Sequence, residues 1–130
     1  MKFDLLVEQA IKAKEKAYAP YSNFKVGAVV VTDDNKLYTG CNIENVSYGA
    51  TNCAERTAIY KAVSEGHYKI KALAVVGDES DFTYPCGICR QVIQEFATED
   101  FQIVIIKNKE EYMVKTLEDI FPLAFKINSL

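Results

Sequence analysis

The stretch CAERTAIYKAVSEGHYKIKALAVV, residues 53–76, decides the fold because it joins a helical pattern to a buried strand. Over 53–65, small and apolar residues recur at three- and four-residue spacing, and Gly66 then supplies a natural helix end. Over 70–76 the apolar residues are nearly continuous, as in a parallel strand covered on both faces. A helix followed by such a strand predicts an α/β fold.

The segment before this stretch predicts one helix and a pair of strands. Residues 4–19 carry apolar side chains at helical spacing, and Pro20 ends the pattern. Two strands are expected at 24–31 and 36–42. The short polar turn at 33–35 joins them, so we expect these strands to pair as an antiparallel hairpin.

The segment after it predicts a further helix over 86–97, strands over 101–107 and 112–115, and a short helix from Thr116. The complete order, α-β-β-α-β-α-β-β-α, implies a mixed five-stranded sheet with helices on both faces. A chain of 130 residues is about the length of one domain, so we expect residues 1–130 to form a single catalytic domain.

Composition excludes several classes of protein. Hydrophobic residues make up 49% of the chain, which argues against disorder. Fifteen basic residues against eighteen acidic ones give a net charge of -3 without a basic stripe, so we expect no nucleic-acid partner. We also expect no membrane segment and a cytoplasmic location, because apolar runs are short and residues 1–16 do not resemble a signal peptide.

Three of the four cysteines lie in two motifs, NCAER at 52–56 and PCGICRQ at 85–91. Each motif opens a predicted helix, where the helix dipole and free N–H groups favour a thiolate. Both helices follow loops at the end of a strand, so their starts can meet at one edge of the sheet. Cys53, Cys86 and Cys89 would then hold a tetrahedral zinc ion and leave one position open, as catalytic sites do.

The residues around these motifs complete a candidate site. No convincing fourth protein ligand is available. His67 lies at the far end of the 53–65 helix, and Cys41 is expected to be buried as a small apolar residue. The open position on the zinc ion is therefore expected to hold water. Glu55, two residues from Cys53, is expected to transfer protons between the zinc-bound water and the substrate. Without the three cysteines nearby, the simpler interpretation would be a carboxylate that stabilises the helix dipole. Arg56 is expected to donate hydrogen bonds to one or two of the ligand sulfurs, rather than to lie exposed.

These two motifs resemble those of the small cytidine deaminases that hold zinc with three cysteines. The resemblance covers essentially the whole chain, including YAPYSNFKVGA at 18–28 and TGCNIENVSYG at 39–49. It implies a three-layer α/β/α sandwich and one zinc ion per chain. It also implies hydrolytic deamination of cytidine and 2′-deoxycytidine to uridine and 2′-deoxyuridine, with release of ammonia, in pyrimidine salvage.

The resemblance also implies residue roles. Zinc-activated water would attack C4 of the pyrimidine while Glu55 shuttles protons. Asn42 and Glu44, two apart in extended chain and therefore on one side of it, would hydrogen-bond the sugar hydroxyls, chiefly the 3′-hydroxyl. Short family members form homotetramers with shared sites. Further substrate contacts are implied for Phe24 against the base, Ile43 within the N-I-E-N segment, the Ala54 backbone on the base, and Phe125 reaching into a neighbouring subunit.

Four other interpretations stay open at this point. A deaminase of a nucleoside antibiotic such as blasticidin S would share the zinc motifs but is not expected to carry N-I-E-N at 42–45. Deamination of a polynucleotide is disfavoured by the lack of basic surface. Cys86 and Cys89 alone could form a dithiol redox motif, which would hold no stoichiometric metal. A structural zinc module would need a fourth protein ligand.

Overall fold

The computed structural model describes residues 3–127, and its helices and strands follow the predicted order. The bounds are α1 Asp4–Lys14, β1 Gly27–Thr32, β2 Leu37–Cys41, the 3-10 turn η1 Tyr48–Ala50, α2 Ala54–Ser64, β3 Ile70–Val76, α3 Gly87–Phe96, β4 Ala97–Asn108, β5 Glu111–Thr116 and α4 Leu117–Ile120.

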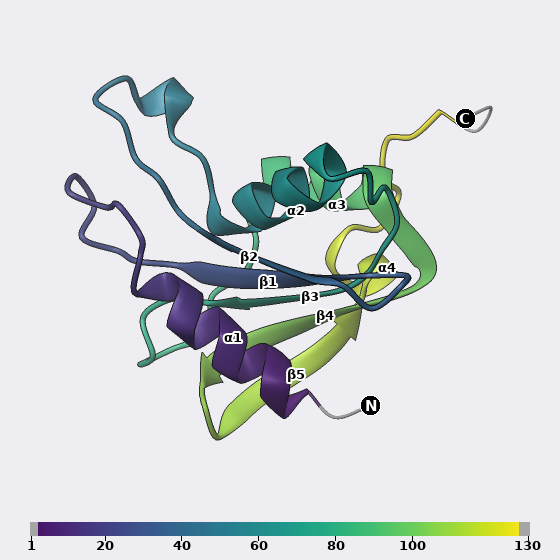
Figure 1. Cartoon of the computed structure of the whole chain (residues 1–130), viewed down its shortest axis with the longest axis horizontal. Coiled ribbons are helices and arrows are strands. Elements are labelled where there is room, and N and C mark those ends of the chain that lie inside the picture. Colours follow the sequence, from purple (N-terminus) through teal and green to yellow (C-terminus); the bar gives the residue numbers. More distant parts are fainter. Residues whose placement is uncertain (1–2, 128–130) are drawn as a thin grey trace.

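The strands form one mixed sheet in the order β2-β1-β3-β4-β5 (Figure 1). The β3–β4 pair is parallel and the other three pairs are antiparallel, so the predicted five-stranded mixed sheet and the β1–β2 hairpin are confirmed. The parallel pair requires a crossover connection, which α3 provides. Within residues 3–127, no helix is long and apolar enough to cross a membrane.

Helices cover both faces of the sheet, which confirms the three-layer α/β/α sandwich (Figure 1). On one face Leu6 and Ala10 of α1 pack with Val29 and Ala74, among others. The opposite face of the sheet is covered by α2 and α3. Because successive residues of a strand point to opposite faces, a central strand such as β3 needs apolar residues at almost every position.

Three boundaries differ from those predicted. The first helix ends at Lys14 rather than at residue 19, because Tyr18 turns away to pair with the chain at 42–44. The first strand begins at Gly27 rather than at residue 24. The fourth begins at Ala97, directly after α3, rather than at residue 101. Each difference depends on contacts between segments distant in sequence.

Gly40 lets the site-bearing helix α2 lie directly on the sheet. A Cβ at this position would collide with the backbone nitrogen of Ala58 and lie 2.5 Å from the carbonyl oxygen of Ala54. Real Cβ atoms do not approach backbone atoms this closely, so only glycine permits this packing. Gly40 therefore helps to set the position of the start of α2.

Candidate active site

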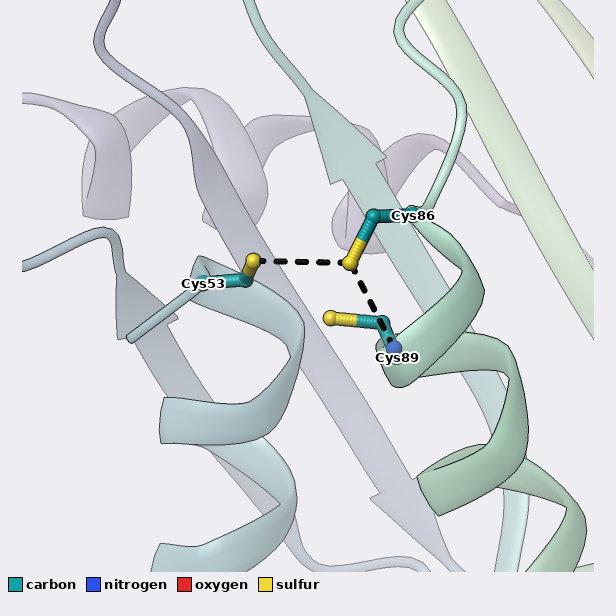
Figure 2. Close-up of side chains that lie close together, drawn as sticks. All are labelled: Cys53, Cys86 and Cys89. Atoms are coloured by element: carbon teal, nitrogen blue, oxygen red, sulfur yellow. Dashed lines mark hydrogen bonds between the residues drawn. The ribbon is translucent and has the colours of Figure 1, made fainter. Parts of the chain in front are cut away.

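The three predicted cysteines come together at the N-termini of two neighbouring helices (Figure 2). Cys53 is the N-cap of α2 and Cys86 is the N-cap of α3, both with extended backbone. Cys89 lies in the first turn of α3, and its backbone N–H donates to the sulfur of Cys86. Figure 2 shows the three sulfurs directed into the gap between the two helix ends.

The sulfur geometry fits a zinc ion. The three sulfurs all lie within 4.8 Å of one another, and those of Cys53 and Cys86 are 3.7 Å apart. Zn–S bonds of about 2.3 Å in a tetrahedron place sulfurs about 3.8 Å apart. Among residues 3–127, this is the one group of three or more candidate ligands found. His67 does not belong to this group of ligands; its Nδ1 lies 3.4 Å from Oδ1 of Asp34.

Arg56 makes the hydrogen bond expected of it. Its Nη2 donates to the sulfur of Cys53 at a distance of 3.2 Å. Interaction with Cys89 and this hydrogen bond together lower the pKa of Cys53 to about 5, so its thiolate is favoured. A hydrogen bond with Cys53, together with burial, raises the pKa of the Cys89 thiol. A set of thiols so crowded is suited to a bound cation.

Glu55 lies beside the cysteines in the first turn of α2, and only 4% of its surface is exposed. Burial raises the pKa of this carboxyl to about 7, and the nearby Cys53 acts in the same direction. A buried carboxyl is costly for a protein to retain. A group that titrates near neutral pH in a cavity is what general acid–base catalysis requires.

A cavity of about 260 Å³ opens over the cysteines and brings together most of the predicted site residues. The metal-ligand candidate Cys89 is fully buried, and neither it nor Arg56 lines the cavity. Its lining residues are Ser22, Phe24, Val26, Asn42, Glu44, Thr51, Asn52, Cys53, Ala54, Glu55, Thr83, Tyr84 and Cys86.

Two of the residues predicted to bind substrate lie outside this cavity. The side chain of Ile43 is 46% exposed, and its backbone bridges to Tyr18 and Asn52. Phe125 is 74% exposed, and its carbonyl oxygen accepts a hydrogen bond from Gln91. Neither side chain contributes to this cavity within a single chain.

Asn42 and Glu44 support the rim of the cavity. Asn42 Oδ1 accepts from the backbone N–H of Val26, and Nδ2 donates to the carbonyl oxygen of Phe24. Glu44 accepts hydrogen bonds from the backbone of Tyr21 and Ser22. These contacts hold the segment that carries Phe24, a role that the sequence pattern did not indicate.

Sequence reasoning missed six cavity residues, namely Ser22, Val26, Thr51, Asn52, Thr83 and Tyr84. Thr83 and Tyr84 immediately precede the PCGIC motif, and this adjacency was an available signal. Ser22 lies in the YAPYSNFKVGA segment, which was singled out only for Phe24.

The fold and the site together define a zinc-dependent hydrolytic enzyme, with three thiol ligands at two helix N-termini and a buried carboxyl that does not bind the metal. A family model described as the cytidine and deoxycytidylate deaminase zinc-binding region matches residues 2–105, and the chain belongs to this family.

Relatives of this family match the chain over nearly its whole length. A cytidine deaminase of Sporosarcina psychrophila is 45% identical over all of this chain and 96% of its own. A cytidine deaminase of Halalkalibacterium halodurans is 45% identical over 93% of this chain and 92% of its own. The crystal structure of a Burkholderia pseudomallei cytidine deaminase has a TM-score of 0.90 at 46% identity and covers 96% of this chain and 100% of its own.

Proposed function

We propose that this protein deaminates cytidine and 2′-deoxycytidine to uridine and 2′-deoxyuridine, with release of ammonia, as a step of pyrimidine salvage. One observation carries the proposal: the buried carboxyl of Glu55 shares a cavity with Cys53 and Cys86, whose sulfurs lie within 4.8 Å of that of Cys89. Relatives named cytidine deaminase match 93–100% of the chain and support the choice of substrate.

Cys53, Cys86 and Cys89 would hold one zinc ion per chain, and its Lewis acidity would make water nucleophilic at neutral pH. Arg56 draws charge from the Cys53 sulfur through its hydrogen bond. The three thiolates carry more negative charge than neutral ligands would, and this donor offsets part of it.

Glu55 moves the protons of the reaction. It takes a proton from the attacking water as the new C4–O bond forms, and it delivers that proton to N3 of the ring. A second transfer through Glu55 carries the proton of the new C4 hydroxyl to the exocyclic amine. The C4=O carbonyl then forms as the C4–N4 bond breaks, and ammonia leaves. Glu55 ends the cycle in the state in which it began, and the balance is one water consumed per ammonia released. A pKa of about 7 suits both directions of transfer.

The rim residues orient the nucleoside. Phe24 lies at the wall of the cavity and would pack against the base, while the backbone of Ala54 would hydrogen-bond its amide edge. Asn42 and Glu44 each retain unused hydrogen-bonding capacity after their contacts with the rim, which leaves them able to bind the sugar hydroxyls.

The proposal extends to a homotetramer with shared active sites. Leu123 is fully exposed, with a positive φ of 54°, and Phe125 and Val46 are 74% and 78% exposed. Large apolar side chains in such number favour burial against further copies of the chain. The segment that carries η1 also projects away from the sheet (Figure 1). Phe125 would reach the substrate of a neighbour, and Ile43 would contact substrate within the N-I-E-N segment.

Two further expectations complete the proposal. We propose that residues 1–130 act as a single catalytic domain. We also propose a cytoplasmic location, because none of the cysteines Cys41, Cys53, Cys86 and Cys89 forms a disulfide, as is usual in a reducing compartment.

The test is the ultraviolet absorbance change of cytidine with purified protein, measured together with zinc per chain. We expect deamination with close to one zinc per chain. Zinc without turnover of either nucleoside would reject the substrate and point to another aminopyrimidine nucleoside, such as the antibiotic class. Absence of both, with metal loss during purification excluded, would favour the dithiol redox interpretation.

A further inference from the structure

We propose that Ser22 is a positioning residue whose hydroxyl aims the Glu44 carboxylate at a hydroxyl of the substrate sugar. The inference rests on the proposed function, because it gives Glu44 its partner in the nucleoside. It goes further in assigning a role to a side chain outside the zinc motifs.

The hydroxyl oxygen of Ser22 links the segment that carries Phe24 to the side chain of Glu44. Its hydroxyl donates to Oε2 of Glu44 and accepts a hydrogen bond from the backbone N–H of Phe24 at 3.0 Å. Because the Ser22 oxygen accepts a hydrogen bond from the N–H of Phe24, the hydroxyl proton of Ser22 must point in another direction. That proton points at the carboxylate of Glu44, so the rotation of the hydroxyl is fixed by the chain itself.

The hydrogen bonds to Glu44 leave one place for a ligand. Its Oε1 accepts from two backbone N–H groups, those of Tyr21 at 2.9 Å and Ser22 at 3.1 Å. An ionised carboxylate has about four acceptor positions, two on each oxygen. The Ser22 hydroxyl takes one of the two on Oε2, and the other remains free. The oxygen left to meet the substrate is therefore the one that Ser22 holds.

The local backbone supports this arrangement. Asn23 adopts a left-handed conformation with φ of 58°, which asparagine tolerates better than most residues, and this turn brings the N–H of Phe24 back to the Ser22 hydroxyl. The hydrogen bond from Ser22 also lowers the pKa of Glu44, so the carboxylate stays ionised and acceptor-only near neutral pH. Ser22 and Glu44 both line the cavity above the cysteines.

The test compares two substrates that differ in one hydroxyl, cytidine and 3′-deoxycytidine, in the wild-type and Ser22→Ala enzymes. We expect Ser22→Ala to lower kcat/KM for cytidine by about tenfold, mainly through KM, which is the size of one hydrogen bond to a charged group. For 3′-deoxycytidine we expect a change of less than about twofold, because Glu44 then has no hydroxyl to meet. Ser22→Thr keeps the hydroxyl and is expected to retain the discrimination.

Ser80→Ala is the matched control, since Ser80 is exposed in the loop after β3 and does not line the cavity. Equal losses on both substrates would assign Ser22 a merely structural role and overturn the inference, as would no loss on either. A wild-type enzyme that fails to deaminate cytidine would instead overturn the proposed function. One that uses both nucleosides equally well would overturn the sugar contact of Glu44, and the inference with it.

Discussion

The substitution Gly40→Ala tests whether the packing of α2 on the sheet sets the geometry of the active site. The added Cβ would lie 2.5 Å from the carbonyl oxygen of Ala54 and 3.0 Å from Cα of Ala58, and it would meet the backbone nitrogen of Ala58 as well. Because all three are backbone atoms of α2, a side-chain rotation cannot relieve the clash. To reach ordinary contact distances of about 3.4 Å or more, the helix must move by about 1 Å.

The expected cost follows from this displacement. Overpacking of this kind destabilises a protein by about 1–3 kcal/mol, which for a chain of this length lowers Tm by about 4–12 °C. Because α2 begins at Ala54, the same shift moves Cys53 and Glu55 relative to Cys86 and Cys89 on α3. A misplacement of about 1 Å can reduce catalysis by about 100-fold.

The assay measures thermal unfolding, zinc per chain and cytidine turnover in the same preparations. Gly49→Ala is the matched control, because a Cβ there would have no atom within 4 Å. We expect Gly49→Ala to change stability by less than about 0.5 kcal/mol and to keep its zinc. Wild-type Tm, zinc content and turnover in Gly40→Ala would refute the packing argument.

Three further substitutions test individual residues of the site. Glu55→Gln should keep the fold and the zinc but reduce kcat by about 1000-fold or more, because the amide cannot shuttle protons. Zinc content and turnover measured together check this, and an active variant would remove Glu55 from the mechanism. Arg56→Gln should weaken zinc binding by about 10–100-fold, because the hydrogen bond to the Cys53 sulfur is lost. Competition with a chelator measures the zinc affinity, and full affinity together with full activity would contradict this expectation. Phe125→Ala should raise KM for cytidine with unchanged zinc content; an unchanged KM would show that this side chain does not complete a neighbour's cavity.

The order of helices and strands could be predicted because local patterns determine it. The periodicity over 53–65 and the apolar run over 70–76 correspond closely to α2 and β3. The end of the first helix could not be predicted this way. Residues 15–19 have helical spacing, but Tyr18 exchanges backbone hydrogen bonds with the segment at 42–44, and no local signal in the sequence specifies this pairing.

The zinc site could be predicted for a different reason. Cys86 and Cys89 are three apart at a helix start, and the sheet topology brings Cys53 to the same edge. Ser22 could not be identified, because its role depends on the side chain of Glu44 and on a turn at Asn23.

The most direct test of the central claim is a zinc titration of metal-free protein, with the rate of cytidine deamination measured at each addition. We predict that activity is absent without metal, rises in proportion to added zinc and reaches its plateau at one zinc per chain. Full activity in the metal-free protein, or a plateau far from one zinc per chain, would contradict a catalytic zinc held by Cys53, Cys86 and Cys89.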